Sequence, residues 1–499
     1  MGSRILLIFP PSLYRNYTPP LNLAYLGAVL EQQGNTVGVI DASALYWRGS
    51  TSEIRKSAEA FAPDMIGITL NALFIQPGYE TVRELRSMGV PIVAGGPHPS
   101  LLAHEALDHG VDIVVRGEGE ETIGELVDFV NGKQTLDQIN GISFRRQGFY
   151  RDNPDRPLIT DLDRLPFPAK HLFDRRLYVE DSETYQAMGP IFSGRGCPAR
   201  CSYCYKGVFG QTIRIRSAEN VFLEMLDTYQ RYGTTAFEFM DDAFSVDNRR
   251  VAELCQLILA RMPVPIRWQC TTRLDLTDRN LLELMHNAGC FRVFYGFESG
   301  DRETLRRVRK KLDLDNAIQV LRWTHETGIK SIVGFMYGFP WETEEQVNNT
   351  TKIIKRISRF VNEINPLGIM VPVPGTAIYK EYADQYGFKD WWLRDEYGAK
   401  YRSNRYYPFF RRRFYNDFAL LEDGFFPFPP RVRRAIIRGT RTIGWHNLRR
   451  NNNLVKALIL LGVVYLSMGI YRIHPSVEQW LFSRLGQLKA IITSRSSRY

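Results

Sequence analysis

The sequence predicts an α/β protein in which a doubly wound parallel sheet is followed by a second series of βα units and a basic, mainly helical C-terminal region. Apolar runs of strand length alternate with segments of helix length over residues 1–130, and again over residues 190–370. The strand-like runs are almost continuously apolar, as parallel strands covered by helices on both faces are. The charge balance changes sharply near residue 400, which sets the last region apart.

The composition is that of a folded protein of about three domains. Among 499 residues, 44% are hydrophobic and 24% charged, which excludes a disordered, collagen-like or coiled-coil chain. Six cysteines are too few for a disulfide scaffold, and the apolar run in Met1–Pro10 is too short for a signal peptide. We therefore expect a cytoplasmic protein, in which clustered cysteines bind metal or do chemistry.

Five βα units are predicted at the N-terminus. The expected strands are Ile5–Phe9, Thr36–Ile40, Met65–Thr69, Pro91–Ala94 and Asp112–Val115, and the expected helices are Leu21–Gln33, Ser52–Phe61, Gly78–Met88, Ser100–Asp108 and Glu121–Val130. Such sheets bind ligands at the carboxyl ends of their strands. The candidate binding residues there are Asn71, Gly95, Gly96, Pro97, His98, Glu118 and Gly119. No G-x-G-x-x-G follows the first strand, which disfavours a nicotinamide site, and Gly-Gly-Pro with one histidine also suits an ordinary loop.

The strongest motif is Gly194–Cys204, in which Cys197, Cys201 and Cys204 have the spacing C-x3-C-x2-C. Three thiolates in one loop favour a soft metal centre, whereas a structural zinc site needs a fourth ligand that is not evident. Three thiolates leave one iron of a [4Fe-4S] cluster open for a small molecule. Cys255, Cys270 and Cys290 lie far apart in sequence, and we expect them to be buried as small apolar residues.

This spacing, with the aromatic Tyr203 before the third cysteine, resembles the radical S-adenosylmethionine (SAM) superfamily. Alternating segments follow the motif, as that resemblance requires: Ala236–Met240, Asp247–Arg261, Arg267–Thr271, Thr277–Asn287, Phe291–Tyr295, Asp315–Thr327, Lys330–Met336, Glu344–Ile357 and Asn362–Met370. With the short strand Pro190–Ser193 they make six βα-type units. The resemblance implies a partial (β/α)6 barrel whose active residues lie at the carboxyl ends of its strands.

The resemblance also implies which residues contact SAM. Asp241 and Asp242 would meet its amino group, Arg273 its carboxylate, and Glu298 with Ser299 its ribose, while Gly334 and the backbone of Tyr203 would lie near the adenine. Each acid by itself could be a solvated strand-end or helix-capping residue, but four such positions in the order of the family outweigh that alternative.

An α/β domain directly before such a barrel resembles the cobalamin-binding radical SAM enzymes over residues 1–380. We expect a Rossmann-like cobalamin-binding domain at 1–140, a linker with a hairpin-like stretch at 141–185, the barrel at 186–380 and a basic C-terminal region at 381–499. The D-x-H-x-x-G motif that supplies an axial histidine is absent, because Pro10–Tyr17 holds no histidine. The resemblance therefore implies base-off cobalamin without a histidine from that loop.

The implied activity is methylation of an unactivated carbon, with an electron donor of the flavodoxin or ferredoxin type. A cobalamin-assisted cyclisation, as in the anaerobic magnesium-protoporphyrin ester cyclase, stays open. RNA methylthiolation is disfavoured because the three N-terminal cysteines of a second cluster are missing. A membrane-bound metallo-adaptor with an inactive barrel is the non-enzyme alternative. The aromatic pairs at Trp391–Trp392 and Tyr406–Phe410 suggest a large apolar or planar substrate, or core packing.

The C-terminal region is strongly basic. Residues 401–499 hold 18 Lys and Arg against 4 Asp and Glu, a net charge of +14, whereas the first 400 residues carry 46 against 50, a net −4. The arginines include Arg411–Arg413, Arg431, Arg433, Arg434, Arg438, Arg441, Arg449 and Arg450, and the uncharged run Ala457–Tyr471 follows. That run has 15 residues, short of the roughly 20 that span a bilayer. We expect a peripheral membrane surface and no nucleic acid, with a buried helix as the alternative.

Overall fold

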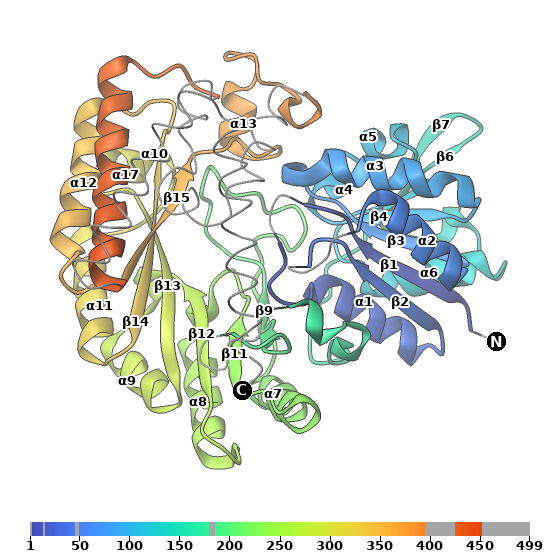
Figure 1. Ribbon diagram of the computed structural model, residues 1–499, viewed down its shortest axis with the longest axis horizontal. Helices are drawn as coiled ribbons and strands as arrows, with labels where there is room; N and C mark the ends of the chain where they lie inside the picture. Colours follow the sequence, from blue (N-terminus) through green and yellow to red (C-terminus); the bar gives the residue numbers. More distant parts are fainter. Residues whose placement is uncertain (1, 13–14, 45–48, 179–184, 395–424, 452–499) are drawn as a thin grey trace, which may run out of the picture. The chain divides into compact units, whose positions relative to one another are not determined.

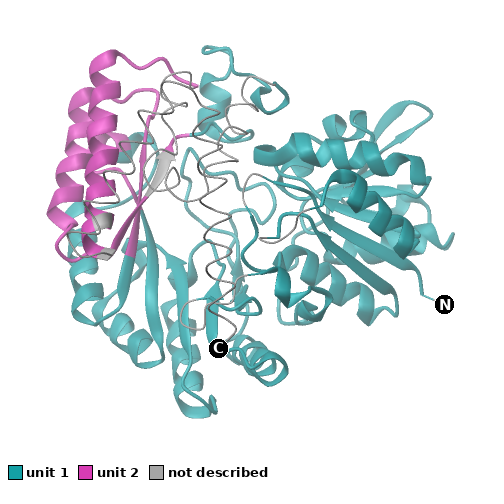
Figure 2. Cartoon of the chain, in the orientation of Figure 1, with its two compact units in different colours: residues 1–296, 305–331, 371–398 teal, residues 297–304, 332–370, 399–499 magenta. Residues whose placement is uncertain are grey.

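The computed structural model describes residues 2–12, 15–44, 49–178, 185–394 and 425–451. The chain forms two compact units (Figure 2). Unit 1 holds residues 1–296, 305–331 and 371–398, and unit 2 holds residues 297–304, 332–370 and 399–499. Unit 1 contains both the N-terminal sheet and the cysteine loop, so the contacts between these two parts are internal to it.

The N-terminal sheet has seven strands in the order β2-β1-β3-β4-β5-β6-β7 (Figure 1). The strands β1 (Arg4–Phe9), β2 (Thr36–Asp41), β3 (Met65–Thr69), β4 (Ile92–Gly95) and β5 (Ile113–Val115) are parallel. The strand β2 lies on one side of β1 and β3 lies on the other, so the direction in which strands are added to the sheet changes at β1. Ligands bind at such a switch point. The predicted doubly wound sheet is thereby confirmed.

A hairpin extends this sheet beyond the five predicted strands. The strands β6 (Ile142–Arg146) and β7 (Phe149–Asp152) run antiparallel to each other, and β6 pairs antiparallel with β5. Phe144 is 1% exposed and belongs to the core of the sheet. The hairpin-like stretch of the expected linker is therefore part of the N-terminal domain.

Six α-helices in the described ranges cover the N-terminal sheet. They are α1 (Leu21–Gln32), α2 (Thr51–Phe61), α3 (Ile75–Leu85), α4 (Pro97–Leu101), α5 (Ala103–Asp108) and α6 (Glu120–Val130). The single helix expected over Ser100–Asp108 is two short helices, because Leu102 has the non-helical angles φ −126° and ψ 57°. This break places Gly96 and Pro97 at the start of α4, directly after β4.

The second sheet has six strands in the order β15-β14-β13-β12-β11-β8, as the six predicted βα-type units require. In unit 1 these are β8 (Pro190–Ile191), β11 (Ala236–Phe239), β12 (Arg267–Thr272) and most of β13 (Cys290–Glu298), with the helices α7 (Ala218–Tyr232), α8 (Asn248–Arg261), α9 (Arg279–Asn287) and α11 (Leu314–Glu326). Helix α7 was not among the expected segments. Its signal was Ser217, whose side chain accepts a hydrogen bond from the backbone N–H of Asn220 and caps the helix.

Unit 2 contains β14 (Lys330–Tyr337), α12 (Glu344–Ile357), β15 (Glu363–Ile369) and α17 (Pro430–Asn451). The buried face of α17 includes Val432, Ala435, Ile436 and Ile443. Asn447 fastens the helix to β15, since its Oδ1 accepts from the N–H of Ile364 (2.8 Å) and its Nδ2 donates to the carbonyl of the same residue (2.7 Å).

Two further expectations concern buried residues. Cys255, Cys270 and Cys290 are 0%, 3% and 1% exposed, which confirms that they are core residues. Trp391 and Trp392 are also buried, and their indole N–H groups donate to Pro372 and Glu105, so core packing explains this pair. Residues 406–410 and 411–413 lie outside the described residues.

Within the described part of the chain, every helix is too short or too polar to cross a lipid bilayer. The apolar run 457–471 lies outside that part.

Candidate active site

The three cysteines lie on a loop that is closed at its neck by two short strands. The strands β9 (Gly194–Arg195) and β10 (Arg214–Ile215) pair antiparallel, and the loop between them carries Cys197, Cys201 and Cys204. Gly196 starts the loop with φ +86°, and a Cβ there would lie 2.3 Å from the carbonyl oxygen of Thr212. Only glycine fits this position, so the backbone geometry of the neck explains why a glycine precedes Cys197.

Backbone hydrogen bonds hold the cysteine loop against later segments of unit 1. The N–H of Ser202 donates to the carbonyl of Val308 (3.0 Å), and the carbonyl of Ser202 accepts from the N–H of Ile378 (3.1 Å). Ile378 lies in α13 (Ala377–Tyr382). The turn between the second and third cysteines is therefore fixed on both sides.

The three thiols share one electrostatic neighbourhood. Burial raises the pKa of the Cys204 thiol, and the nearby Cys201, Asp242 and Cys197 raise it further while Lys206 opposes them. Burial alone would lower the pKa of Lys206, but Cys204 and Cys197 raise it above its ordinary value. The basic group beside the thiols was not foreseen from the sequence, and its signal was its position two residues after Cys204.

The two consecutive acids after β11 have different surroundings. Asp241 is 5% exposed, and its carboxylate accepts from the N–H groups of Ser193 (2.7 Å) and Gly194 (3.1 Å). Arg250 lies 3.9 Å from the same carboxylate. Asp242 is exposed, lines the cavity described below and interacts electrostatically with Cys204. The structure therefore brings Asp242 to the cysteines and commits Asp241 to the segment before them.

Arg273 also lies near the thiols. Burial alone would lower its pKa, but the carboxylate of Asp275, which its guanidinium contacts at 2.7 Å, raises it, with smaller contributions from Cys201 and Cys197. The predicted carboxylate-binding arginine thus keeps a protein partner of its own.

Of the remaining predicted SAM residues, Tyr203 lies half-buried in the cysteine loop of unit 1, and the other three lie in unit 2. Glu298 is 5% exposed and has φ +69°, a left-handed conformation that is uncommon for a residue with a side chain. Ser299 is fully buried, and its hydroxyl lies 3.0 Å from that of Thr350 on α12. Gly334 is a buried residue of β14, three residues before the strand ends. These positions are described within unit 2 alone, so their contact with SAM stays a prediction.

A cavity of about 600 Å³ lies at the carboxyl ends of the N-terminal strands, within unit 1. Its walls come from the strand-end segments of the N-terminal sheet and from residues of the cysteine loop and β11. The second group comprises Tyr205, Lys206, Val208, Phe209 and Gly210 of the loop, Met240 and Asp242 just after β11, Pro190 and Phe192 before the loop, and Arg195 at its neck. Met240 is 44% exposed although it is large and apolar. The cavity therefore extends from the N-terminal domain to the neighbourhood of the thiols.

Six of the seven predicted cobalamin residues line this cavity: Asn71, Gly95, Gly96, Pro97, Glu118 and Gly119. A Cβ at Gly95 would meet no atom within 4 Å, which leaves the backbone open to a ligand. His98 does not line the cavity: its Nε2 lies 2.7 Å from Glu105, and its side chain is fully buried. His98 is therefore a buried histidine paired with a half-buried carboxylate, which is the structural alternative to a ligand-binding role.

The donor sets fit the cofactors that these residues suggest. Among the described residues no three His, Cys, Asp or Glu side chains surround a single metal position. In a [4Fe-4S] cluster each thiolate binds a different iron, so the three thiols of one fixed loop satisfy that requirement without converging on one point. The glycine-lined strand ends and the largely apolar cavity above them fit a large planar cofactor such as a corrin.

Comparison with known proteins gives two family matches. Residues 191–354 match the radical SAM superfamily, and residues 13–127 match the B12 binding domain. An uncharacterized methyltransferase from Pyrococcus horikoshii is 31% identical over 76% of this chain and 83% of its own length. Cytidylyl-2-hydroxyethylphosphonate methyltransferase from Streptomyces wedmorensis is 28% identical over 68% of this chain and 73% of its own. Hopanoid C-3 methylase from Methylococcus capsulatus is 24% identical over 88% and 82%.

The other matches concern the cyclase and the fold. The anaerobic magnesium-protoporphyrin IX monomethyl ester cyclase of Rubrivivax gelatinosus is 26% identical over 74% of this chain and 67% of its own length. TsrM from Kitasatospora setae, solved with cobalamin and a [4Fe-4S] cluster, has a TM-score of 0.63 at 20% identity and covers 78% of this chain and 76% of its own. OxsB with aqua-cobalamin has a TM-score of 0.67 at 16% identity over 98% and 75%. These two structures share the fold of this chain.

Proposed function

The chain belongs to the cobalamin-binding radical SAM enzymes, and from this premise we propose that it methylates an unactivated carbon of a large or apolar substrate. The family uses a [4Fe-4S] cluster, SAM and cobalamin. When bound, the cluster supplies the electron that cleaves SAM, and cobalamin supplies the methyl group. The electron comes to the cluster from a reduced donor of the flavodoxin or ferredoxin type.

One observation carries the proposal: the cysteine loop and the strand ends of the N-terminal sheet are walls of the same cavity. SAM would activate the substrate carbon and cobalamin would donate the methyl group, so both cofactors would have to lie beside that carbon, and this arrangement provides such a place. Lys206 and Asp242 face the cavity and interact electrostatically with the thiols. They are therefore the side chains that we expect at the junction of the cluster, SAM and the corrin.

The chain's own residues have three tasks in this proposal. Cys197, Cys201 and Cys204 hold the cluster, and the loop's hydrogen bonds to Val308 and Ile378 keep them in place. Asp242 and Arg273 orient SAM by charge-assisted hydrogen bonds. The apolar lining, which includes Met240, excludes water from a reactive radical.

The cluster assignment is tested by replacing Cys197, Cys201 and Cys204 with Ala, one at a time and together. After anaerobic reconstitution, we expect each variant to lose the broad cluster absorbance and the cleavage of SAM to 5′-deoxyadenosine. C255A is the matched control, because Cys255 is a core residue away from the loop, and it should retain about four irons per chain. Iron persisting in the triple variant would disprove the assignment.

Two observations support a large or apolar substrate. The hopanoid C-3 methylase aligns with 88% of this chain, and Met240 presents an apolar surface inside the cavity. Cyclisation is the second candidate, favoured by the similarity to the porphyrin ester cyclase. Mass spectrometry of products separates the two, since methylation with deuterated SAM adds one labelled methyl group and cyclisation adds none.

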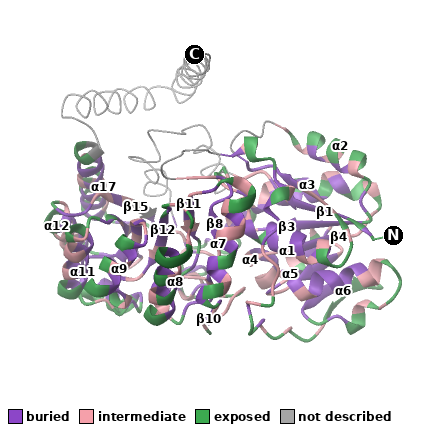
Figure 3. Ribbon diagram, turned by 90° about the horizontal axis from the view of Figure 1, so that it is seen from below, coloured by how far each residue is buried: buried purple, intermediate pink, exposed green. Residues whose placement is uncertain are grey.

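We propose in addition that α17 contacts an anionic membrane surface. Its exposed side chains include Arg431, Arg434, Arg438, Arg441 and Arg449, whose spacings of three, four, three and eight residues place them on one helical face. The exposed positions of α17 are green in Figure 3. The helix holds no acidic residue, and of these five arginines Arg438 is paired, with Glu344 at 3.0 Å. The apolar run 457–471 follows this face in the sequence, which favours a lipid surface over nucleic acid.

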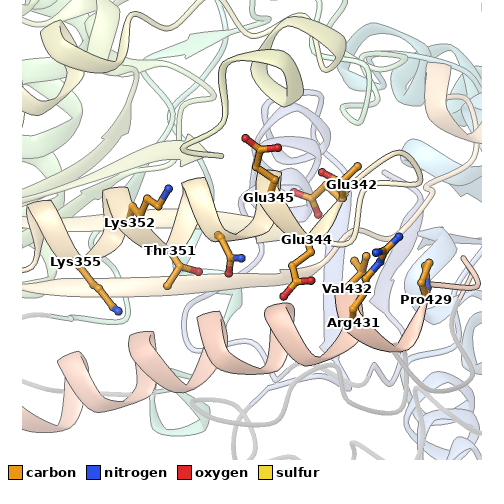
Figure 4. Close-up of a pocket in the computed structure, with 11 residues that line it drawn as sticks. Glu342, Glu344, Glu345, Thr351, Lys352, Lys355, Pro429, Arg431 and Val432 are labelled. Carbon is orange, nitrogen blue, oxygen red and sulfur yellow. The ribbon is translucent and has the colours of Figure 1, made fainter.

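A groove beside α17 carries both basic and acidic groups. It lies between α12 and the start of α17, and Lys352, Lys355 and Arg431 line it together with Glu344 and Glu345 (Figure 4). Its acidic members lie at the end of the groove near Arg431, and the two lysines lie further along α12. Glu342 also lines the groove, so its lining holds three acidic and three basic side chains, and the positive charge of this surface comes from the exposed arginines of α17.

Co-sedimentation with phosphatidylserine vesicles tests the membrane surface. Each basic residue near an anionic bilayer contributes about 1 kcal/mol, so R431Q/R434Q/R441Q should weaken binding about a hundredfold at low salt. The control R176Q/R249Q/R279Q removes the same charge from exposed positions of unit 1 and should bind like the wild type. Equal binding of both variants, or preferential binding to DNA, would contradict a membrane surface.

A further inference from the structure

Two arginines face each other across the neck of the cysteine loop. Arg195 on β9 pairs directly with Arg214 on β10 in the antiparallel register. Like charges opposite each other on neighbouring strands repel, so this pair needs an anion between them. Both side chains are 5% exposed, and water cannot supply the compensation.

Glu118 is that anion, and it comes from the N-terminal domain. Its Oε1 accepts from Arg195 Nη1 and from Arg214 Nη1, each at 2.8 Å, while its Oε2 accepts from Arg214 Nη1 at 2.6 Å. The N–H of Ile159 donates to the same Oε2 at 2.8 Å. The carboxylate is 3% exposed, and four hydrogen bonds saturate it.

Glu120 balances the remaining charge. Its carboxylate accepts from Arg195 Nη2 at 2.5 Å, so two acids and two arginines form one buried, neutral network. Burial alone would lower the pKa of Arg195, but Glu120 and Glu118 raise it, which keeps the guanidinium charged. A buried network of this kind adds little to stability over apolar packing, but it specifies one arrangement of the groups that form it.

The network is also a wall of the cavity. Glu118 and Glu120 line it from the segment after β5, and Arg195 lines it from the neck of the cysteine loop. Glu118 thus touches both arginines that bracket the three cysteines, while the adjacent Gly119 faces the cavity. We infer that Glu118 is a positioning residue that fixes the cysteine loop, and with it the cluster, at a set distance and orientation from the corrin. This inference rests on the proposed function.

Glu118 has hydrogen-bond partners that the sequence did not reveal. As one of several strand-end residues it was expected to contact cobalamin directly. Its oxygens are instead occupied by Arg195, Arg214 and the Ile159 backbone, so it acts on the cofactors through the loop. The adjoining Gly119 remains available for direct contact.

Paramagnetic coupling between the two cofactors tests this role. In the reconstituted wild type, the EPR signal of cob(II)alamin should be split or broadened by the reduced cluster. E118Q should retain four irons and bound cobalamin but show a coupling that is weaker and heterogeneous. E121Q is the matched control, because Glu121 on α6 also pairs with arginines, at partly exposed positions outside the cavity lining, and it should behave like the wild type.

E118Q leaves one buried positive charge without a carboxylate and could misfold for that reason. A second variant therefore serves as a control for misfolding. E118Q/R214Q restores charge balance, because Arg195 and Glu120 remain paired. It should melt within a few degrees of the wild type, yet amide exchange over residues 196–213 should rise at least tenfold and the coupling should still be weakened. Wild-type coupling in this folded variant would overturn the inference.

The same measurement separates this inference from the proposed function. If the wild type shows no cobalamin signal, the proposed function fails, and wild-type amide exchange in both Glu118 variants would then overturn the inference as well.

Discussion

Replacement of Asp241 should damage the fold around the cysteines, whereas replacement of its neighbour Asp242 should damage SAM binding alone. Asp241 accepts hydrogen bonds from the backbone N–H groups of Ser193 and Gly194, which directly precede the cysteine loop. The hydroxyl of Ser193 also donates to the Asp241 carboxylate, and the guanidinium of Arg250 lies 3.9 Å from it. Burial raises the pKa of Asp241, and Arg250 and the hydrogen bonds from Ser193 oppose that shift.

The structure sets the magnitude of each effect. D241A leaves the Arg250 guanidinium, whose side chain is 5% exposed, without its carboxylate, and breaking a buried pair in this way costs about 3–5 kcal/mol. The entropy of unfolding scales with chain length and reaches roughly 1 kcal/mol per degree for 499 residues, so the melting temperature should fall by roughly 3–5 °C. D242A removes an exposed side chain, so its effect on unfolding should stay within about 0.5 kcal/mol. Loss of one charge-assisted hydrogen bond of about 1.5–3 kcal/mol should weaken SAM binding ten- to a hundredfold.

Three measurements on both variants decide the question: thermal melting, iron per chain after reconstitution, and the dissociation constant of SAM by equilibrium dialysis. We expect D241A to melt early and to hold less iron, and D242A to keep its iron and lose SAM affinity. The reasoning is refuted if D241A melts like the wild type, holds four irons and loses SAM affinity as D242A does.

Two further predictions concern unit 2. Burial raises the pKa of Glu342 to about 8, against the opposing hydrogen bonds from the N–H groups of Gly338 and Phe339. Because the pKa of Glu342 is higher in the folded protein than the unfolded value of 4.5, its contribution to stability is fully present below that value. This contribution is lost as the pH rises through about 8, by at most about 1.4 kcal/mol per pH unit. Melting curves between about pH 5 and pH 9 should therefore fall more steeply for the wild type than for E342Q, and parallel curves would contradict the assignment. N447A should lower the free energy of unfolding, measured in urea, by about 2–5 kcal/mol, because two buried backbone groups of Ile364 lose their partners. The control T442A, at a half-buried position of the same helix, should change this free energy by less than about 1 kcal/mol.

Much of the fold was accessible from the sequence because apolar periodicity dominates it. The strand predicted at Met65–Thr69 and the helix predicted at Glu344–Ile357 have the observed bounds, and the other named strands and helices differ mainly at their ends. Strand ends are uncertain because the last residues lose their apolar pattern where they enter a site. The hairpin β6–β7 was seen as a hairpin but assigned to a linker, since nothing local says which sheet edge a hairpin joins.

The candidate site divides in the same way. The cysteine loop was predictable because its ligands are close in sequence, and so were the glycines at the strand ends, where backbone must approach a ligand. The network of Glu118, Glu120, Arg195 and Arg214 was not, because its members lie up to 96 residues apart and each is an ordinary charged residue by itself. A pairing that exists only in the folded chain has no signal in a single sequence.

The roles of Asp241 and Asp242 are a different case, because the sequence contained the information that separates them. Successive side chains of a strand point to opposite faces of the sheet. Phe237 and Phe239 are both 1% exposed, and Phe239 packs against Phe244 and Trp268. Backbone pairing continues past the end of β11, since the N–H of Met240 donates to the carbonyl of Ile191. Asp241 therefore follows the two phenylalanines to the helix-covered face, where it meets Arg250 of α8, and Asp242 follows Met240 into the cavity.

The same alternation holds on the next strand. Trp268, Cys270 and Thr272 are buried on the face that α8 and α9 cover: the indole N–H of Trp268 donates to Ala288, and the Thr272 hydroxyl lies beside Ser245. Arg273 has the opposite parity and lies near the thiols. Where a strand of such a barrel shows two apolar residues of equal parity before a pair of acids, the acid of the other parity is the one to assign to the site. Applied to Phe237-Glu238-Phe239-Met240-Asp241-Asp242, this rule selects Asp242 from side-chain alternation alone.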